Sequence, residues 1–488
     1  MNGRHIIAID QSTSASKVFL LDEKGEIIRR FSKAHQQFYP QPGHVEHDAE
    51  EIWQNVQEGI AEVSQGAPTV AALAISNQRE TTVLWERKTG RPLGKAVVWQ
   101  DVRGEALCQS LSAHADMVRR QTGLPLSPYF PAAKAASVLQ ANPAWQAGAQ
   151  SGDVCIGTVD SYLVYRLTEG KIFQTDVSNA SRTQLMQLDT LAWSEELCAL
   201  FGIPMSCLPQ IVPSDASFGV TEGGCVIPAG IPITGVMGDS HAALFGQGCH
   251  KVGMAKATYG TGSSVMMNIG RKPALSEHGL ATSVGFSFQD EICYVLEGNI
   301  TCSGDTLCWL QDEAGLIHAA AETEAISASV PDTQGVYLVP AFSGLGAPHG
   351  DSDARALICG MNRSTTRAHI VRAALESLAY QDADVISAME HDTGSQLSEL
   401  KVDGGPTRNA LLMQFQADLL GCPVQCAGAS ELSALGAGYM AGLTTGLYAG
   451  MGIISPNAGQ RYFPQMTEAQ RKPLLDGWKK AVRRCQQR

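Results

Sequence analysis

The chain has 488 residues, 44% of them hydrophobic and 17% charged, which is enough apolar material for two domains with cores of ordinary size. Its 36 basic and 48 acidic residues give a net charge of -12, which argues against sequence-independent binding to nucleic acid or to an anionic membrane. The 13 scattered cysteines form no C-x-x-C pair and no apolar stretch reaches 18 residues, so we expect a soluble cytoplasmic protein.

The first half of the chain alternates strands and helices. Residues 5–10 and 17–22 read as two strands joined by the hydroxyl-rich turn QSTSAS. A helix with one apolar face begins at Asp48, an expected N-cap. Strands follow at 69–78, 81–86 and 95–101, and the alternation continues through 157–167. This pattern predicts an α/β fold with mixed strand directions.

The second half repeats this order. Residues 232–239 read as a strand that ends at Asp239, and 241–248 read as a short helix. A strand, a Gly/Thr turn and a second strand follow in 253–270. Residues 400–421 then read as a strand, the turn DGG and a helix. The repeat predicts an internal duplication, with an N-terminal domain at 1–250 and a C-terminal domain at 251–488.

Three turns carry groups suited to a nucleotide. The turn at Ser12, Thr13 and Ser14 offers hydroxyls and backbone N–H groups to an anion, and Lys17 adds a charge. An ordinary hairpin turn has the same composition, so this turn alone does not decide. The turn at 259–263 takes the corresponding place in the second half, and the DGG turn opens a helix. Together they indicate the nucleotide clamp of actin-like duplicated ATPases.

Glycine is unusually frequent, with 49 residues and no linker or short repeat to explain it. Glycine lets the backbone approach a ligand closely. We therefore expect part of the surplus to lie against the nucleotide, namely Gly260, Gly262, Gly304, Gly404 and Gly405.

Long segments carry a family signature: AIDQST, SNQRETTVLWE, TGLPLSPYF, GTVDSYL, SNASRT, GDSHAALFGQG, KATYGTGSS, FSGLGAP and KVDGGPTRNALLMQFQADLLG. On these segments the chain resembles the FGGY carbohydrate kinases, and within them the glycerol kinases, along almost its whole length. The resemblance implies two duplicated actin-like (ribonuclease H-like) ATPase domains around a central cleft. It also implies ATP-dependent phosphorylation of a terminal hydroxyl of a polyol or sugar, with Mg²⁺.

The resemblance also implies roles for single residues. Asp239 corresponds to the catalytic base, although an aspartate that only caps the next helix would look the same. Asp10 corresponds to the aspartate that holds Mg²⁺, in keeping with the preference of that ion for carboxylate oxygen and water. The remaining residues are expected to contact ATP: Ser12, Thr13, Ser14 and Lys17 at the phosphates, and Thr261, Gly304, Gly405 and Asn409 elsewhere on the nucleotide.

The first turn departs from the family pattern. The family usually has Gly, Thr and Arg where this chain has Ser12, Ser14 and Lys17. A lysine keeps the positive charge of arginine but cannot donate two hydrogen bonds in one plane. We therefore expect slower phosphoryl transfer than in a Lys17→Arg variant.

The acceptor site matches that of glycerol kinases at five positions, Arg79, Glu80, Trp99, Tyr129 and Asp239. An arginine that donates and a glutamate that accepts suit the two adjacent hydroxyls of a vicinal diol. An exposed salt bridge at a strand end is the alternative. This alternative is disfavoured because NQRE lies between two apolar strands, where burying a charged pair that binds nothing would cost free energy of folding.

Two further pocket positions differ from glycerol kinases. Ser240 replaces a glutamine and Ser264 replaces a phenylalanine that packs on the glycerol carbons, so the pocket gains volume and hydroxyls. The pattern of Trp99, Asp101 and Arg103 is similar to the W-x-D-x-R of pentulose kinases, which adds Asp101 to the expected substrate contacts.

Three functions follow, in order of preference. The leading hypothesis is a kinase for a polyol or ketose of four to six carbons. The alternative is a glycerol kinase that produces glycerol 3-phosphate. An actin-like ATPase that acts on a protein partner is a remote third, which the matched acceptor residues disfavour. A homodimer or higher homo-oligomer is expected by default. The stretch 219–230, where some glycerol kinases bind an inhibitory sugar bisphosphate, has no basic residue, so we expect no such site.

Overall fold

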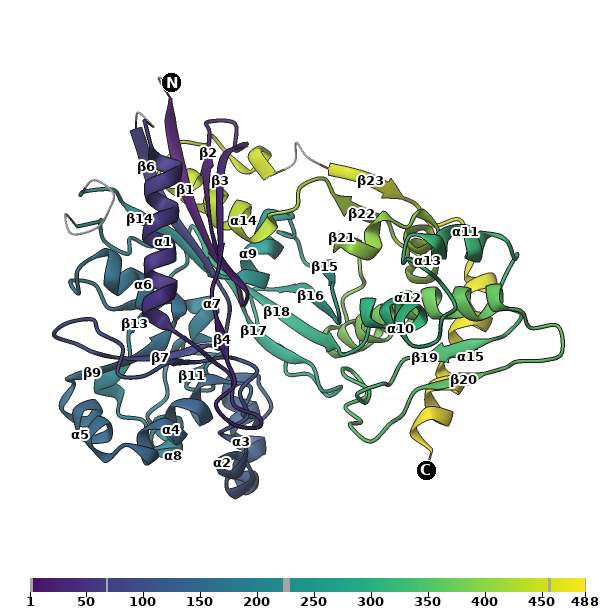
Figure 1. Ribbon diagram of the computed structural model, residues 1–488, viewed down its shortest axis with the longest axis horizontal. Helices are drawn as coiled ribbons and strands as arrows, with labels where there is room; N and C mark the ends of the chain where they lie inside the picture. Colours follow the sequence, from purple (N-terminus) through teal and green to yellow (C-terminus); the bar gives the residue numbers. More distant parts are fainter. Residues whose placement is uncertain (1–2, 67–68, 223–228, 455–457, 488) are drawn as a thin grey trace.

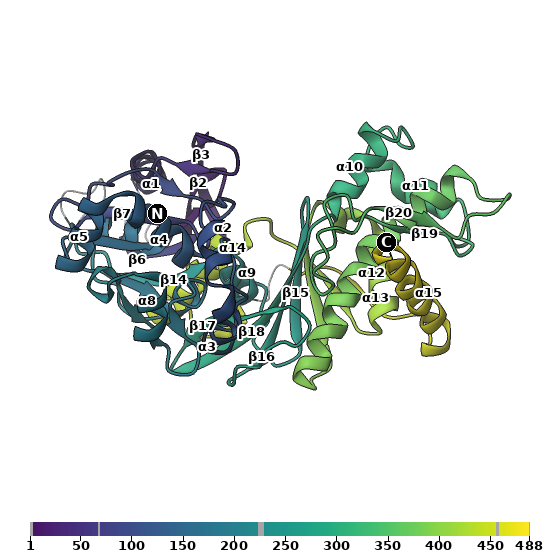
Figure 2. The same cartoon turned by 90° about the horizontal axis from the view of Figure 1, so that it is seen from below.

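The structure is a computed structural model that describes residues 3–66, 69–222, 229–454 and 458–487. Two mixed sheets form its centre, one in each half of the chain (Figures 1 and 2). The first sheet has the order β14 (Ile233–Gly238), β6 (Thr69–Asn77), β1 (Arg4–Gln11), β2 (Ala15–Leu21) and β3 (Ile27–Ala34). The second has the order β17 (Ala281–Phe288), β18 (Glu291–Ile300), β16 (Ser263–Gly270), β15 (Met254–Tyr259), β21 (Glu399–Gly404), β22 (Val424–Ala427) and β23 (Ala458–Tyr462).

The two sheets share one topology. In the first, β1 pairs antiparallel with β2 and parallel with β6, which in turn pairs parallel with β14. In the second, β15 pairs antiparallel with β16 and parallel with β21, which pairs parallel with β22. The predicted α/β duplication is therefore confirmed. Each half places a short hairpin turn beside the carboxyl ends of its parallel strands, where α/β proteins bind ligands.

Helices cover both faces of the first sheet. On one face, α1 (Ala49–Ser64) and α6 (Val159–Leu167) pack against alternate residues of β1 such as Ile7 and Ile9. On the other face, Ile6 and Ala8 lie in one apolar cluster with α9 (Asp239–Gly246) and α14 (Leu432–Thr444). This period-2 alternation, buried on both faces, is typical of a central strand.

Helices α9 and α14 lie between the two sheets, because their cluster also contains Met266 of β16 and Phe286 of β17 (Figures 1 and 2). They cross closely at Gly436, where an added Cβ would be 1.8 Å from the Ala242 carbonyl oxygen. Helix α14 belongs to the second half of the sequence but packs on the sheet of the first half. The domain bounds 1–250 and 251–488 remain a prediction.

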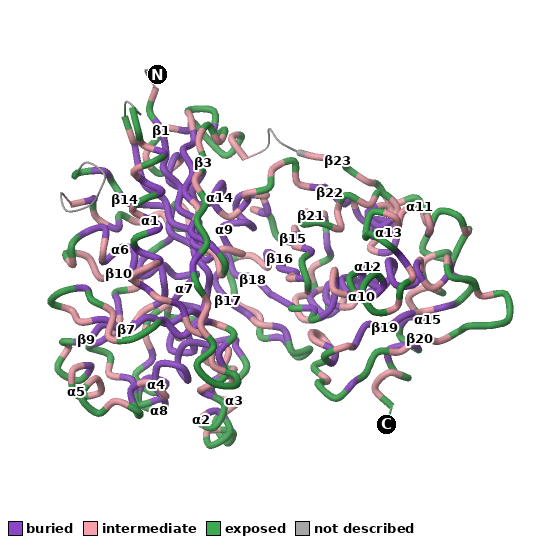
Figure 3. Tube along the Cα trace, in the orientation of Figure 1, coloured by how far each residue is buried: buried purple, intermediate pink, exposed green. Residues whose placement is uncertain are grey.

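The second sheet has its own helical layer, which forms a large core with β15 and β21 (Figure 3). Its members are α10 (Gly304–Asp312), α11 (Glu322–Ala328), α12 (Arg367–Thr393), α13 (Ala410–Leu420) and α15 (Glu468–Gln486). The 3-10 turn η3 (Gly405–Arg408) connects β21 to α13, and the two-stranded sheet of β19 (Tyr337–Val339) and β20 (Leu357–Cys359) packs on α12 and α15.

A smaller subdomain extends from the first half. Its five-stranded sheet has the order β4 (Gln37–Phe38), β5 (Glu46–His47), β8 (Ala96–Val97), β7 (Thr82–Glu86) and β9 (Val154–Thr158). Its short helices are α2 (Glu105–Ser110), η1 (Ser112–His114), α3 (Ala115–Thr122), α4 (Pro131–Ala141), α5 (Pro143–Ser151), α8 (Glu195–Phe201) and η2 (Met205–Cys207). Two small sheets complete the first half, β10 (Gln174–Asp176) with β13 (Gln210–Val212) and β11 (Met186–Gln187) with β12 (Ala192–Trp193). Strand β10 and helix α7 (Val177–Ala180) contact β14 of the first sheet.

Most predicted elements are present, with small shifts. Asp48 caps α1 as expected, accepting hydrogen bonds from the backbone N–H groups of Glu50 and Glu51. The helix predicted at 241–248 begins at Asp239 itself. The strand predicted at 95–101 shortens to Ala96–Val97, which leaves Trp99 and Asp101 in a turn. The described cysteines are free thiols, and no described helix is long and apolar enough to cross a membrane.

Candidate active site

The turn between β1 and β2 is closed by its own side chains. Ser12 donates from its backbone N–H and from Oγ to the Ala15 carbonyl, both at 2.9 Å, and its Oγ accepts from the Ala15 N–H at 3.3 Å. The Thr13 carbonyl oxygen lies 2.9 Å from Nε2 of His35, and Ser14 is exposed. Ser12 thus shapes the turn, the Thr13 hydroxyl accepts from Trp99 at 3.0 Å and keeps its own hydrogen to donate, and the Ser14 side chain is exposed.

Lys17 is already paired. Its Nζ lies 2.9 Å from Glu431 Oε2, just before α14, with the two side chains 30% and 20% exposed. In this structure the ammonium group therefore faces a carboxylate, and the contact of Lys17 with phosphate stays a prediction. A phosphate at the turn would have to compete with Glu431 or share the ammonium group with it.

Asp10 is a buried carboxyl at the end of β1. Burial raises its pKa to about 7, and repulsion from Asp239 adds to the increase. The Oγ of Ser76 donates to it at 3.0 Å. Lys17 on the neighbouring strand lowers the pKa, but burial and Asp239 outweigh it, so a cation would stabilise the ionised carboxylate and the predicted Mg²⁺ fits Asp10.

The described residues contain no group of three His, Cys, Asp or Glu side chains that could hold a metal. A metal ion at Asp10 would therefore take its other ligands from water and phosphate, as Mg²⁺ commonly does.

Four charged side chains form a buried ring beside Asp239. Arg79 donates to both oxygens of Glu297, from Nη1 at 2.9 Å and from Nη2 at 2.7 Å. Arg182 lies 3.0 Å from the same carboxylate through Nη1 and donates from Nε to Glu80 at 2.6 Å. All four side chains are at most 7% exposed. The Nε of Arg79 also lies 3.3 Å from Asp239 Oδ1.

Asp239 begins α9 directly after β14, where the sequence predicts it. Its side chain is 34% exposed. Burial is the main cause that raises its pKa, while Arg79 and the Ser240 N–H lower it. The structure thus brings Asp239 together with Arg79. A carboxylate with a raised pKa, at the edge of solvent, is suited to accept a proton.

Two aromatic side chains lie next to this ring. Trp99 and Tyr129 have ring centroids 5.6 Å apart. The indole Nε1 of Trp99 donates to Thr13 Oγ1 at 3.0 Å, which links the aromatic pair to the turn between β1 and β2. Burial is the main cause that raises the pKa of Tyr129, and charge repulsion from Glu80 adds to it. The Tyr129 side chain therefore lies near Glu80, one of the two predicted diol-binding residues.

Asp101 has a structural role. Its carboxylate accepts from the Val45 N–H at 2.7 Å and from Arg103 through Nε at 2.9 Å and Nη2 at 2.8 Å. The side chain is fully buried and both oxygens are used by these donors. The W-x-D-x-R pattern therefore forms an internal clamp in this chain, and the structure does not present Asp101 to a substrate.

The two serine positions differ in surroundings. Ser264 on β16 donates from Oγ to Glu297 Oε1 at 3.1 Å, so its hydroxyl is used by the buried ring. Ser240 is the second residue of α9 and is partly buried. The expectation of two free hydroxyls on the pocket wall is thus met at most by Ser240, and the smaller volume of both side chains remains.

A pocket of about 410 Å³ lies in the second half, between α10, α11 and η3. It contains three of the predicted nucleotide residues, Gly304, Gly405 and Asn409. Asn409 caps α13 by accepting from the Leu412 N–H and donates to Thr323 at 3.2 Å. The volume lies in the range of small-molecule sites.

Thr261 lies in the exposed turn between β15 and β16, next to the start of α10. Its carbonyl accepts from the N–H groups of Ser303 at 2.8 Å and Asp305 at 3.1 Å, and Gly304 donates to the Gly260 carbonyl at 2.9 Å. The turn therefore uses the N–H groups at the start of the helix, and the Thr261 side chain remains exposed.

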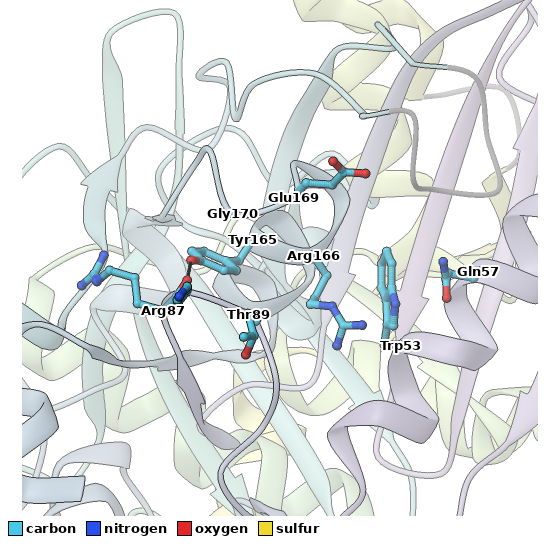
Figure 4. Close-up of a pocket in the computed structure, with 10 residues that line it drawn as sticks. Trp53, Gln57, Arg87, Thr89, Tyr165, Arg166, Glu169 and Gly170 are labelled. Atoms are coloured by element: carbon cyan, nitrogen blue, oxygen red, sulfur yellow. Dashed lines mark hydrogen bonds between the residues drawn. The ribbon is translucent and has the colours of Figure 1, made fainter.

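Another cavity, of about 340 Å³, lies on the first half among α1, α6 and the turn after β7 (Figure 4). Its arginines are used within the protein. Arg166 pairs with Glu50 at 2.7 Å and stacks on Trp53, and Arg87 donates to the Ser206 carbonyl at 2.9 Å. The cavity includes no predicted site residue, and we assign it no role.

Sequence reasoning missed several buried charges. Glu297 lies within the apolar strand YVLEGNI, where a glutamate is a recognisable signal because an unpaired charge there is costly. Lys134 on α4 donates to the Tyr129 carbonyl, and burial lowers its pKa to about 7. Lys256 on β15 donates to Thr258 at 3.0 Å, and burial lowers its pKa as well. Residues 223–228, part of the stretch 219–230 in which we expect no sugar bisphosphate site, lie outside the described residues.

Comparisons with known proteins agree with this geometry. The profile of the FGGY family of carbohydrate kinases, N-terminal domain, matches residues 5–246, and that of the C-terminal domain matches residues 255–445. The chain belongs to the FGGY family of carbohydrate kinases. It is an enzyme of the phosphotransferase class with an alcohol group as acceptor.

Among curated relatives, glycerol kinase of Burkholderia ambifaria is 45% identical over 99% of this chain and 98% of its own length. Glycerol kinase 1 of Thermotoga maritima is 45% identical over 98% and 99%. The crystal structure of Plasmodium falciparum glycerol kinase with ADP superposes with a TM-score of 0.96 at 36% identity, covering 100% of this chain and 99% of that one. A ligand-bound xylulose kinase from Lactobacillus acidophilus, at 21% identity and a TM-score of 0.88, shares the fold.

Proposed function

We propose that this FGGY kinase transfers the γ-phosphoryl group of ATP to a primary hydroxyl of glycerol and produces glycerol 3-phosphate. The observation that carries the proposal is the contact between Arg79 and Asp239, at 3.3 Å, beside Glu80 and the Trp99–Tyr129 pair. Glycerol kinases that are 45% identical to this chain over nearly their full length support glycerol over a longer acceptor.

The roles follow from the chemistry of each group. Asp239 accepts the proton of the acceptor hydroxyl. The hydroxyl oxygen of the acceptor bonds to the γ-phosphorus while the bond from that phosphorus to ADP breaks. Arg79 and Glu80 hold two adjacent hydroxyls, and Trp99 and Tyr129 pack on the carbons. The hydroxyls of Thr13, Ser14 and Thr261 donate to the phosphates, and the pocket of Gly304, Gly405 and Asn409 takes the nucleoside. Mg²⁺ held at Asp10 would neutralise phosphate charge.

A kinase for a polyol or ketose of four to six carbons is the second candidate. One observation favours it: Ser240 and Ser264 are small, and the Ser264 hydroxyl bonds to Glu297, so neither residue fills the volume of a glutamine or a phenyl group. A protein-directed ATPase is not proposed, because the family membership makes the chain a carbohydrate kinase.

A coupled assay of ADP release separates the two candidates. We expect glycerol to give the highest kcat/KM among glycerol, erythritol, pentitols and pentuloses. A longer acceptor with the highest value would replace glycerol by the second candidate. Turnover of ATP that no polyol or ketose increases would contradict both.

The Ser264→Phe variant tests the pocket wall directly. A phenyl group would pack on the glycerol carbons and exclude longer chains, so we expect the ratio of kcat/KM for glycerol over erythritol to rise roughly 10-fold. Ser264→Ala is the matched control, because it removes the hydroxyl without filling the space and should leave the ratio nearly unchanged. An unchanged ratio in Ser264→Phe would remove Ser264 from the acceptor pocket.

A further inference from the structure

The buried ring beside Asp239 joins residues that are far apart in the sequence. Arg79 and Glu80 follow β6, Arg182 follows α7, and Glu297 lies on β18 of the second sheet. The side-chain contacts run from Glu80 through Arg182 and Glu297 to Arg79, and the backbone between Arg79 and Glu80 closes the ring. Two positive and two negative charges make the ring neutral as a whole. The proposed diol site thus depends on a strand that the sequence places in the other half of the chain.

The contacts within the ring determine which donor and acceptor atoms of Arg79 and Glu80 remain available to a substrate. Glu297 takes one hydrogen from each terminal nitrogen of Arg79, and Nε faces Asp239, which leaves the second hydrogen on each terminal nitrogen. Arg182 binds Oε1 of Glu80 and leaves Oε2. Two donors and one acceptor in a fixed arrangement are what two adjacent hydroxyls require.

The backbone of this pair is held under strain. Glu80 has a φ of +60°, a left-handed conformation that is unfavourable for a residue other than glycine. Such a conformation persists only where surrounding contacts determine it. The 2.6 Å hydrogen bond from Arg182 to Glu80 holds this carboxylate in place.

We propose that Glu297 and Arg182 are positioning residues that fix Arg79 and Glu80 in the geometry for a vicinal diol. This inference rests on the proposed function. Ser264 belongs to the same arrangement, because its hydroxyl donates to the Glu297 oxygen that also accepts from Arg79. A change at the pocket wall is therefore coupled to the orientation of the diol-binding arginine.

Three variants test this role, Glu297→Gln, Arg182→Gln and the double variant that carries both. Each single change leaves an unpaired buried charge, so we expect a lower melting temperature. We also expect KM for the polyol to rise about 10-fold or more, with KM for ATP within twofold of wild type. The double variant restores neutrality, so its melting temperature should recover relative to the single variants while KM for the polyol stays high.

The Glu376→Gln variant is the matched control. Glu376 is also buried and pairs with an arginine, Arg372 at 2.7 Å, but within α12. We expect it to lower the melting temperature without changing KM for the polyol. A merely structural role for Glu297 would behave in the same way.

Two results would overturn the positioning role: a folded Glu297→Gln enzyme with unchanged KM for the polyol, or a double variant in which that KM returns to the wild-type value. The second remains measurable if the single variants do not fold. A wild-type enzyme that phosphorylates no polyol would contradict the proposed function itself.

Discussion

Asp239 lies at the first position of α9, where one oxygen faces Arg79 and also accepts from the Ser240 N–H at 2.6 Å. Burial raises its pKa, whereas these two contacts lower it. A base must be deprotonated to act, so kcat/KM should fall as the pH falls through this raised pKa. The balance between burial and Arg79 therefore sets the lower end of the working pH range.

The Asp239→Asn variant should keep the site's shape and lose the base. We expect kcat to fall about 10²- to 10⁴-fold, with KM for ATP within twofold of wild type. Steady-state kinetics with a coupled ADP assay measures both. Asp116→Asn changes an exposed aspartate in an ion pair with Arg120 and serves as control. Turnover within tenfold of wild type in Asp239→Asn would assign the base elsewhere.

Lys17 offers a second test of a single residue. Its ammonium group pairs with Glu431, whereas the planar fork of an arginine can bond to a carboxylate and a phosphate together. We expect Lys17→Arg to raise kcat by roughly threefold or more, because charge-assisted bonds to the transferred group increase. Single-turnover measurements at saturating substrates follow this step. Unchanged or slower transfer would mean that Lys17 does not act on the phosphates.

The role of a single residue was predictable where its place at the end of a strand or helix is enough to define that role, as for Asp48, which caps α1. The sequence did not indicate a second, structural role for the glycines of the predicted nucleotide site. An added Cβ at Gly262, Gly304 or Gly404 would be 2.0 to 2.5 Å from a carbonyl oxygen of the protein's own backbone. These glycines are required for backbone packing around the turns. Of the two glycines that line the pocket, Gly304 and Gly405, an added Cβ would meet free space at Gly405.

At the scale of elements, the proposed nucleotide pocket depends on how α10, α11 and η3 are arranged, and a thiol is part of its lining. Cys308 on α10 is the exposed thiol among the described cysteines, and it lines the pocket. The turn between β15 and β16 holds the start of α10 through backbone bonds at 2.9 and 3.1 Å. A ligand in the pocket would therefore cover Cys308 without moving the helix.

We expect ATP or ADP to slow the alkylation of Cys308 by at least about fivefold, since a pocket of this kind covers most of its ligand. Peptide mass spectrometry after a short exposure to iodoacetamide measures the rate at each cysteine separately. Cys485, which is partly buried on α15, is the internal control and should react equally with and without nucleotide. Equal labelling of Cys308 in both conditions would place the nucleoside outside this pocket.

The elements themselves were largely predictable because their hydrophobic periods are clear, as in HIIAID and in the helix capped by Asp48. The contacts between elements were not, because they join distant segments. No local pattern connects Glu297 of β18 to Arg79 after β6, or Lys17 of β2 to Glu431 before α14. A residue type at a single position was also insufficient. The sequence pattern indicated that Asp101 contacts the substrate, whereas its carboxylate is paired with Arg103 in the structure.

At the scale of the whole molecule, the two sheets are joined through the crossing of α9 and α14. Asp239 begins α9, so the position of the proposed base depends on a helix packed against Gly436 of α14. The close approach leaves no space for a side chain at this point.

The Gly436→Ala variant should lower stability by about 1 to 3 kcal/mol, because an added methyl group overlaps the Ala242 carbonyl at the crossing. We expect kcat to fall as well, because α9 carries Asp239. Thermal melting and steady-state kinetics measure the two effects. Gly452→Ala is the control, since its added Cβ meets nothing within 4 Å. A melting temperature equal to that of wild type would show that the crossing can relax.

Helix α14 has a consequence for how the chain is made. The face of the first sheet that carries Ile6, Ala8 and Phe19 is covered by residues of α14, including Leu435 and Ala437. During synthesis the part of this face that α14 covers stays open until residue 444 has left the ribosome, although the strands beneath it are completed by residue 238 and α9 by residue 246. We expect this apolar surface to be prone to aggregation over some 200 residues of further translation, and a fragment that ends at residue 250 would keep α9 but expose the part of the face that α14 covers.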